Sequence, residues 1–329
     1  MIGSQIAGLG TAVPDRVLGN EELAPTLGIT PEWIVERTGI EQRYVAADDD
    51  TASSLGARAA MYALRAAEIK AADVDLVICA TVTGDLQFPS TACLIQDAIG
   101  ARAGAFDLAA GCSGFLYALA QADAAIRSGT AQIVLVVGSE VLSRITDHRD
   151  AKTAVLFGDG AGAAVVERTD GATRVGPFSL GSDGSRPELL YVDTGSGLIQ
   201  MQGREVYRAA VDKMTSSVVE LLSDCGMSIR DVDLLVAHQA NQRILDAVAA
   251  RAGIPREKVI SNIARYGNTS AASIPIALSE AQSSGLLNDG DLVVLTAFGA
   301  GFTWGAGLVR WGTNARTDSE RVGAGMADA

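Results

Sequence analysis

The hydrophobic residues of this chain gather in short unbroken runs, separated by longer stretches with helical spacing. The runs are rich in Val, Ile and Leu and do not alternate strictly with polar residues, which predicts strands covered on both faces. They are VDLVICATV, QIVLVVGS, GAAVVE, VDLLVAHQ, DLVVLTAFG and GAGLVRW. Apolar periodicity predicts helices over 52–67, 113–128, 206–225, 241–252 and 270–284. This alternation of strands and helices indicates an α/β fold with parallel or mixed sheets.

One strand–turn–helix plan occurs twice along the chain. The first copy contains FDLAAGCSGF and the second contains NIARYGNTSAAS, and each leads into a predicted helix that ends in Ser-Gly. When those Ser-Gly pairs are superimposed, Cys112 falls on Asn268, and each stands where a strand-like run becomes helical. A pseudo-twofold duplication would bring the two turns to one centre, with a thiol on one side and an amide on the other.

The duplication divides the chain into two similar halves, 1–170 and 171–312, whose central helices should pack against each other. The Gly/Ser-rich segment 181–203 is predicted to be a surface loop between the halves. Residues 313–329 are small, polar and aperiodic, which predicts a flexible tail.

Composition excludes several classes of protein. With 329 residues, 48% of them hydrophobic, the chain can bury a large core. A formal charge of −13 argues against nucleic acid as a partner, because phosphate binding needs a basic face. No apolar run reaches the roughly 18–20 residues of a membrane span, and the N-terminus lacks the features of a signal peptide. We therefore expect a cytoplasmic protein without a membrane partner.

Only one of the four cysteines has the surroundings of a nucleophile. Cys79 and Cys93 lie in apolar runs and Cys225 closes a helix, with no CxxC pair or His-rich neighbour to suggest a disulfide or metal site. Cys112 stands at a predicted helix start, between glycines that permit a tight turn. Unpaired N–H groups and the helix dipole favour the reactive thiolate there. An inert buried cysteine is the alternative.

Two further side chains are candidates for the same centre. His238 ends the run VDLLVAHQ at the entry to a helix, a position where α/β proteins place ligand-binding and catalytic groups. His148, the other histidine, lies in a charged loop and is expected to be solvated. Asn268 could be a helix cap, but the Thr and Ser that follow it would cap equally well.

Two glycine-rich loops occupy equivalent places in the two copies. FGDGAGAA leads into a strand rather than a helix, which disfavours a dinucleotide site. FGAGFTWG can place the backbone N–H of Ala300 beside that of Cys112, and such a pair forms an oxyanion hole.

Around Cys112, His238 and Asn268 the chain resembles the thiolase-fold condensing enzymes, in particular the β-ketoacyl-acyl-carrier-protein synthase III family. The matching strings extend to about Trp311 and are PEWIVERTGI, AGCSGFLYAL, FGDGAGAAV, HQANQRI, GNTSAASIP and AFGAGFTWG. The resemblance implies a thiolase-like five-layer αβαβα fold. It also implies decarboxylative condensation of a short acyl primer with malonyl-acyl carrier protein, which begins a fatty-acid chain.

The resemblance assigns a role to each candidate residue. Cys112 attacks an acyl-CoA thioester to give an acyl-enzyme, and the amides of Cys112 and Ala300 hold the oxyanion. His238 and Asn268 donate hydrogen bonds to the malonyl thioester and stabilise the enolate formed as CO₂ leaves. CoA and phosphopantetheine thioesters are substrates, and no cofactor or metal is implied. The residues implied to bind substrate are Trp33, Arg37, Gly203, Ala240, Asn241 and Phe298.

The resemblance also implies two protein partners. Phe88 matches a bulky residue by which a partner subunit closes the acyl pocket, which implies a homodimer and a short primer. An acidic carrier protein would dock on Arg208, Arg243, Arg251 and Arg256, for which ordinary solvated arginines are the alternative. Family members often carry an arginine that stacks on the CoA adenine; this chain has Ala151 there, with Arg149 and Lys152 nearby.

The sequence also leaves other functions of the same fold to be considered. A starter-unit ketosynthase or acyltransferase of a polyketide pathway is the main alternative, and the missing arginine favours it. A non-catalytic partner subunit would lack the nucleophile, which this chain has in Cys112. A degradative thiolase would need a second cysteine near FGAGFTWG, and this loop has none.

Overall fold

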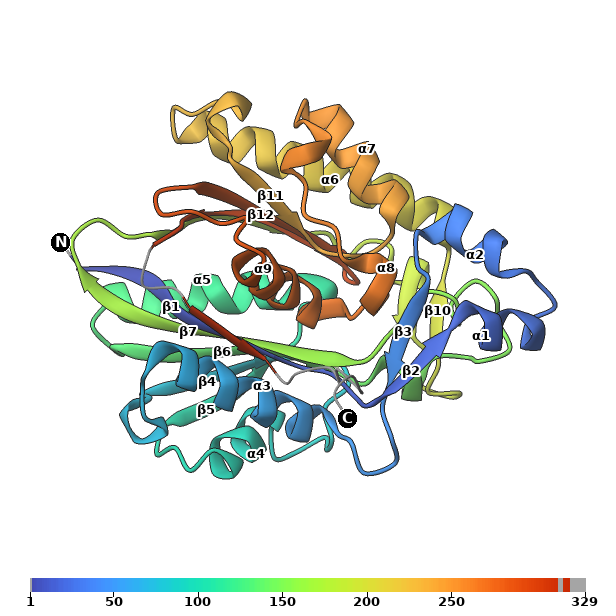
Figure 1. The fold of residues 1–329 in the computed structure, drawn as a ribbon, viewed down its shortest axis with the longest axis horizontal. Helices are drawn as coiled ribbons and strands as arrows, with labels where there is room; N and C mark the ends of the chain where they lie inside the picture. The colour runs from blue at the N-terminus through green and yellow to red at the C-terminus, as the bar shows by residue number, and fades with distance from the viewer. Residues whose placement is uncertain (1, 313–315, 320–329) are drawn as a thin grey trace, which may run out of the picture.

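Two sheets separate three layers of helices in the computed structural model, which describes residues 2–312 and 316–319 (Figure 1). The helices of these layers are α3 (Ala52–Ala67) and α4 (Thr91–Ala98) on one outer face, α5 (Gly114–Arg127) and α9 (Ser273–Ser283) in the middle, and α6 (Gly203–Asp224) and α7 (Gln242–Ala252) on the other outer face. This is the five-layer αβαβα arrangement that the family resemblance implies.

Both sheets are mixed, which is one of the two arrangements that the alternation of strands and helices predicts. The larger sheet has the order β14 (Arg316–Ser319), β1 (Ile2–Ala12), β7 (Gly160–Asp170), β6 (Ile133–Glu140), β4 (Leu76–Ala80) and β5 (Gly104–Leu108). The smaller has the order β11 (Leu234–Ala237), β12 (Leu292–Gly299), β13 (Thr303–Arg310) and β8 (Val175–Ser182). The chain passes from one sheet to the other between β7 and β8, near the predicted boundary at 170.

The middle layer carries the core that joins the two sheets. Leu116 and Leu119 of α5 and Ile274 and Leu278 of α9 are almost wholly buried and belong to one hydrophobic cluster. A helix that is apolar on most of its circumference belongs in a protein interior. The two central helices therefore share a core, and their first turns point into the middle of the molecule.

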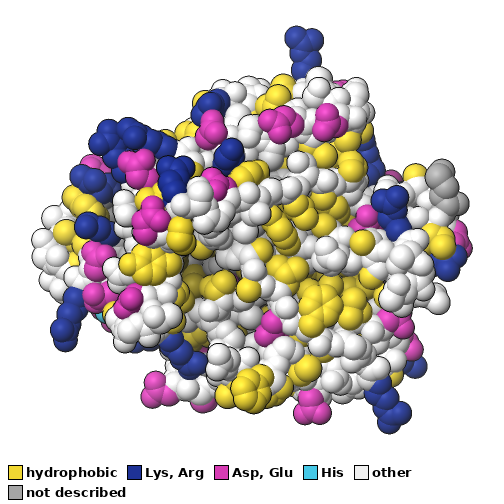
Figure 2. Space-filling model, turned by 180° about the vertical axis from the view of Figure 1, so that it is seen from behind, with side chains coloured by type: hydrophobic (Ala, Val, Ile, Leu, Met, Phe, Trp, Pro, Cys, Tyr) yellow, Lys and Arg dark blue, Asp and Glu magenta, His cyan; other side chains and the backbone are white. Residues whose placement is uncertain are grey.

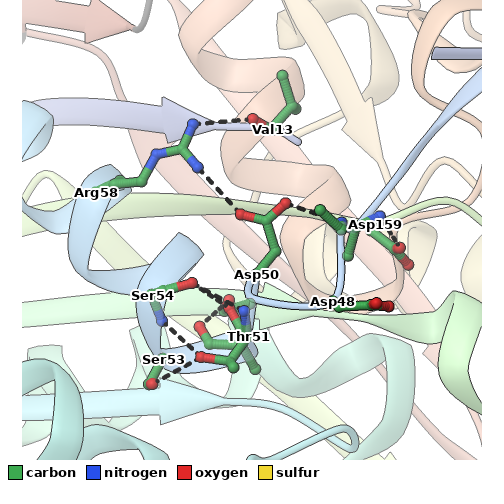
Figure 3. A network of polar contacts seen from close by, with 12 residues as sticks. Val13, Asp48, Asp50, Thr51, Ser53, Ser54, Arg58 and Asp159 are labelled. Atoms are coloured by element: carbon green, nitrogen blue, oxygen red, sulfur yellow. Dashed lines mark hydrogen bonds and ion pairs between the residues drawn. The ribbon is translucent and has the colours of Figure 1, made fainter. Parts of the chain in front are cut away.

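Local capping explains where α3 begins. The Thr51 hydroxyl accepts a hydrogen bond from the Ser54 N–H (3.1 Å), and the Ser54 hydroxyl accepts one from the Thr51 N–H (2.8 Å), as Figure 3 shows. One turn later, Arg58 donates to the Val13 carbonyl (3.1 Å) and pairs with Asp50 (3.5 Å). These contacts fix the helix against the end of β1.

The predicted helices agree closely with the observed ones except at their first turns. α3 has the predicted bounds, and α6 begins three residues before the predicted 206. The helices predicted from 113 and 270 begin later, because 3-10 turns come first at Gly111–Ser113 and Ser270–Ala272. Those two turns contain or follow the residues that the duplication brings together.

Two predictions about irregular segments need correction. Segment 181–203 is not simply a surface loop, since it contains a hairpin of β9 (Leu190–Val192) and β10 (Ile199–Met201). Within the expected tail 313–329, Arg316–Ser319 form a strand parallel to β1. Residues 313–315 and 320–329 lie outside the described residues.

A smaller group of elements lies beside the layers, at the right of Figure 1. It comprises β2 (Arg16–Gly19), β3 (Gln42–Val45), α1 (Asn20–Thr26), α2 (Pro31–Thr38) and α8 (Ile263–Tyr266). The Asn241 amide donates to the Arg37 carbonyl (3.1 Å), which joins this group to the start of α7.

Candidate active site

The two turns related by the duplication meet at one cavity. Gly111 and Gly267, which precede Cys112 and Asn268, both adopt left-handed backbone (φ 53° and 66°) that glycine tolerates best. The cavity has a volume of about 640 Å³ and is lined by Cys112, Asn268 and His238, as well as by apolar side chains. The structure thus brings together the three side chains that the sequence singles out.

The Cys112 thiol is not poised as a thiolate. The residue borders the cavity, but protein surrounds the sulfur on its other sides, and this burial raises the thiol pKa to about 12. A nearby Ser270 hydroxyl lowers the pKa and the charge of Glu140 raises it, both by less than burial. Desolvation therefore opposes the thiolate that the helix start is expected to favour. Attack by this sulfur needs a proton acceptor.

Close backbone packing places the amides of Cys112 and Ala300 together. A Cβ atom on Gly111 would lie only 2.8 Å from the Ala300 nitrogen, and one on Gly299 would clash with the Cys112 nitrogen. The Thr303 hydroxyl donates to the Ala110 carbonyl (2.7 Å), which holds the two loops in contact. Glycine at 111 and 299 is therefore what allows two N–H groups to approach one point.

His238 is neutral, and one of its two nitrogens is held inside the protein. The residue is 1% exposed, and burial lowers the imidazole pKa to about 3. Its Nδ1 lies 2.7 Å from the Ser273 hydroxyl oxygen, which also accepts the Gln239 N–H (3.3 Å). With that N–H accepted, the single hydroxyl hydrogen of Ser273 is free to bond Nδ1. In the tautomer in which this hydroxyl donates to Nδ1, Nε2 carries the imidazole proton and is the nitrogen left for the cavity.

The side-chain oxygen of Asn268 is likewise bonded within the protein. Its Oδ1 accepts the Ser270 N–H (2.9 Å), and its backbone N–H and C=O bond to Leu156 (2.8 Å) and Gly158 (3.0 Å). The Nδ2 amide is the group that remains for the cavity. His238 and Asn268 therefore offer two donors, which suits a carbonyl oxygen that gains negative charge.

Most of the predicted substrate residues also line this cavity: Arg37, Gly203, Ala240, Asn241 and Phe298. Trp33 does not line it, but its ring lies 4.5 Å from the Arg37 guanidinium. Four further residues line the cavity but were not predicted from the sequence: Arg204 and the hairpin residues Leu190, Ile199 and Met201. The only sequence feature that could have indicated the hairpin residues is the presence of short apolar segments within 181–203.

The remaining predicted residues lie on the surface. Phe88 is 82% exposed and is not part of its own chain's cavity wall. Arg208, Arg251 and Arg256 pair with the acidic residues Glu205 (3.6 Å), Asp212 (3.0 Å) and Asp246 (3.2 Å) respectively. Arg243 lines the cavity and stacks near Tyr207. Arg149 and Lys152 are exposed, and Ala151 is half-buried.

Known proteins of one family are similar to this chain along nearly its whole length. Family models described as 3-oxoacyl-(acyl-carrier-protein) synthase III and its C terminal match residues 106–184 and 222–311. A β-ketoacyl-(acyl-carrier-protein) synthase III of Chelativorans sp. (strain BNC1) is 49% identical over 94% of this chain and all of its own. The crystal structure of 3-oxoacyl-(acyl-carrier-protein) synthase III from Aquifex aeolicus VF5 is 46% identical with a TM-score of 0.92, over 94% of this chain and 100% of that one.

A priming β-ketosynthase from the R1128 polyketide biosynthetic pathway has the same fold at a lower identity. It is 35% identical, with a TM-score of 0.90 over 94% of this chain and 96% of that one. Within residues 2–312 and 316–319, no helix is long and apolar enough to cross a membrane. The same residues contain no group of three or more His, Cys, Asp or Glu side chains arranged to hold a metal.

Proposed function

Because this chain belongs to the 3-oxoacyl-(acyl-carrier-protein) synthase III family, we propose that it condenses an acyl-CoA primer with malonyl-acyl carrier protein to start a fatty-acid chain. The protein is an acyl-transferring condensing enzyme. The observation that carries the proposal is the single cavity shared by the Cys112 thiol and the donor sides of His238 and Asn268. We place the reaction in the cytoplasm.

In the first half-reaction, Cys112 sulfur attacks the thioester carbonyl of acyl-CoA. The oxyanion that forms lies between the Cys112 and Ala300 amides, which the glycines at 111 and 299 bring together. Collapse of this intermediate expels CoA and leaves the primer on Cys112. Arg37 and Trp33, stacked near the cavity, are the proposed contacts of the departing CoA.

In the second half-reaction, malonyl-acyl carrier protein enters the same cavity. Loss of CO₂ leaves an enolate whose oxygen accepts hydrogen bonds from His238 Nε2 and Asn268 Nδ2. The enolate carbon attacks the acyl group on Cys112, forming 3-oxoacyl-acyl carrier protein. No cofactor or metal takes part in this scheme, in which both thioesters are substrates.

A homodimer is part of the proposal. The outer strands β5 and β8, which both pack against α5, and the loop after β4 expose the side chains of Val82, Leu86, Phe88, Phe106 and Leu180. Figure 2 shows hydrophobic side chains gathered across the face opposite to that of Figure 1. An exposed apolar patch of this kind favours contact with a protein partner. Val82 also lines the cavity, so a second copy on this face would bring its Phe88 close to the primer.

The carrier protein is proposed to dock around the cavity entrance. Arg37, Arg204 and Arg243 line the cavity, and Arg251 follows on α7. Basic side chains steer an acidic partner even when the overall charge is negative. Since Arg208, Arg251 and Arg256 already have acidic neighbours, the larger contribution is assigned to Arg243.

A primer panel tests this function. The protein is incubated with malonyl-acyl carrier protein and acyl-CoAs of increasing length, and separately with the same acyl groups on the carrier protein. We expect 3-oxoacyl-acyl carrier protein and CO₂ in equal amounts from short acyl-CoAs. Reaction only with carrier-bound primers would instead support the starter-unit ketosynthase of a polyketide pathway. No condensation with any primer would contradict both.

The same panel tests the role of Phe88. Replacing this exposed side chain by Thr (Phe88→Thr) should extend the accepted primers to longer chains, because a smaller side chain from the partner would deepen the pocket. Light scattering should show an unchanged dimer, and Val17→Thr, at a surface position elsewhere, provides the control. An unchanged chain-length preference in a dimeric variant would remove Phe88 from the pocket.

A further inference from the structure

A buried carboxyl group lies behind Cys112 without a place in the scheme above. Glu140 ends β6 and is completely inaccessible to solvent. Its Oε2 accepts hydrogen bonds from the Thr81 hydroxyl (3.2 Å), the Val82 N–H (3.1 Å) and the Thr83 hydroxyl (2.6 Å). Its Oε1 is buried with no hydrogen-bond partner among the described residues. A buried acid with an unoccupied oxygen costs free energy and calls for a reason.

Ser270 stands between this carboxyl and the nucleophile. It lines the cavity, is 2% exposed, and has left-handed backbone (φ 48°) that is unusual for a residue with a Cβ. Its hydroxyl has no aligned hydrogen bond in the described structure, yet it is close enough to both groups to lower the pKa of Cys112 and of Glu140. The Ser270 turn packs against both β6, which ends in Glu140, and the turn that contains Cys112, so the two unpaired oxygens belong to segments in contact with the nucleophile.

The first half-reaction requires a path for a proton. Cys112 is a protonated thiol, so its hydrogen must leave as sulfur attacks. His238 is poorly suited to accept it, because burial disfavours the charged imidazolium and the Ser273 hydroxyl already bonds Nδ1. Glu140 is the other buried titratable group near Ser270.

We propose that Glu140, acting through the Ser270 hydroxyl, takes up the Cys112 proton during acylation. Sulfur forms its bond to the thioester carbon while its hydrogen passes to Ser270 Oγ, and the Ser270 hydrogen passes to Glu140. When the C–S bond to CoA breaks, the same proton returns to the departing thiolate. After condensation, the released Cys112 thiolate takes up a proton from solvent through the cavity, which is the one proton that the overall reaction consumes. This inference rests on the proposed function.

The electrostatics of the site fit this role. Burial raises the Glu140 pKa to about 7, so the carboxyl is ionised and able to accept a proton above that pH and protonated below it. Glu140 in turn raises the thiol pKa of Cys112 and of Cys79 on the adjacent strand β4. Asp85 and Asp107 also raise the pKa of Cys79, which faces away from the cavity lining.

Glu140→Gln tests the proposal while keeping the size of the side chain. The rate of Cys112 acylation by acyl-CoA, followed by rapid quench and intact mass, should fall about 10²-fold at pH 8. In the unchanged protein this rate should rise from about pH 6 to about pH 8, and in the variant that rise should disappear. Cys79→Ala is the control and should keep both the rate and the pH profile, because its thiol lies off the path.

Ser270→Gly gives an independent second test, since glycine accepts the left-handed backbone and the substitution removes the hydroxyl together with its Cβ. It should reproduce the slow, flat acylation profile with an unchanged melting temperature, and it decides the matter if Glu140→Gln does not fold. Wild-type acylation rates and pH dependence in either folded variant would overturn the relay but leave the proposed function intact. Failure of the unchanged protein to form any acyl-Cys112 would instead contradict the proposed function.

Discussion

Cys112→Ala should abolish acyl-enzyme formation completely. Incubated with a short acyl-CoA, the unchanged protein should gain the mass of one acyl group, and the variant should gain none. The reason is that the transferred group has to be held on sulfur at the point where the Cys112 and Ala300 amides meet. The overall condensation rate should fall by at least about 10³-fold, a loss typical of removing a covalent nucleophile.

Two other cysteines provide the controls for this experiment. Cys93 and Cys225 are partly exposed free thiols, so their alanine variants should still acylate at the wild-type rate. Peptide mapping of the unchanged protein should place the acyl group on the peptide that contains Cys112. A labelled Cys112→Ala protein, with the label mapped to another cysteine, would show that the nucleophile has been assigned wrongly.

Cys112 and His238 were accessible from sequence because each follows a strand, β5 and β11 respectively. The run before Asn268, also predicted to be strand-like, is instead the short helix α8. Because β5 and β11 belong to different sheets, the order of strands within one sheet does not explain the site, and it is the duplication that identifies which two turns face each other. The structure adds the donor groups, since Ser273 and Ser270 occupy the acceptor sides of the imidazole and the amide.

Other features depend on contacts between distant segments, which local patterns do not contain. The helix-start argument considers only the local dipole of the chain, whereas burial by surrounding segments raises the Cys112 pKa. Glu140 reads in sequence only as the polar end of the run QIVLVVGSE, and its nearness to Ser270 arises from packing of β6 on the Ser270 turn. An acid that ends a buried strand was the one available signal.

His238→Ala should separate the two half-reactions. Acylation of Cys112 should continue at close to the wild-type rate, because burial makes the imidazole a weak base and Glu140 is the proposed acceptor of the thiol proton. Decarboxylation of malonyl-acyl carrier protein should fall by about 10²- to 10³-fold, since one of the two donors to the enolate oxygen is lost. Intact mass measures the first step, and release of labelled CO₂ measures the second.

Ser273→Ala is the matched variant for this experiment. It leaves the imidazole in place but removes the hydroxyl that holds Nδ1 at 2.7 Å, so decarboxylation should fall by a smaller factor than in His238→Ala. Burial keeps the imidazole pKa at about 3, so the imidazole stays neutral at every pH above that value. Decarboxylation by the unchanged protein should therefore show no step from His238 between about pH 5 and about pH 9. If His238→Ala lost acylation and decarboxylation to the same extent, the imidazole would have to act on the thiol as well, and Glu140 would no longer be needed as the acceptor.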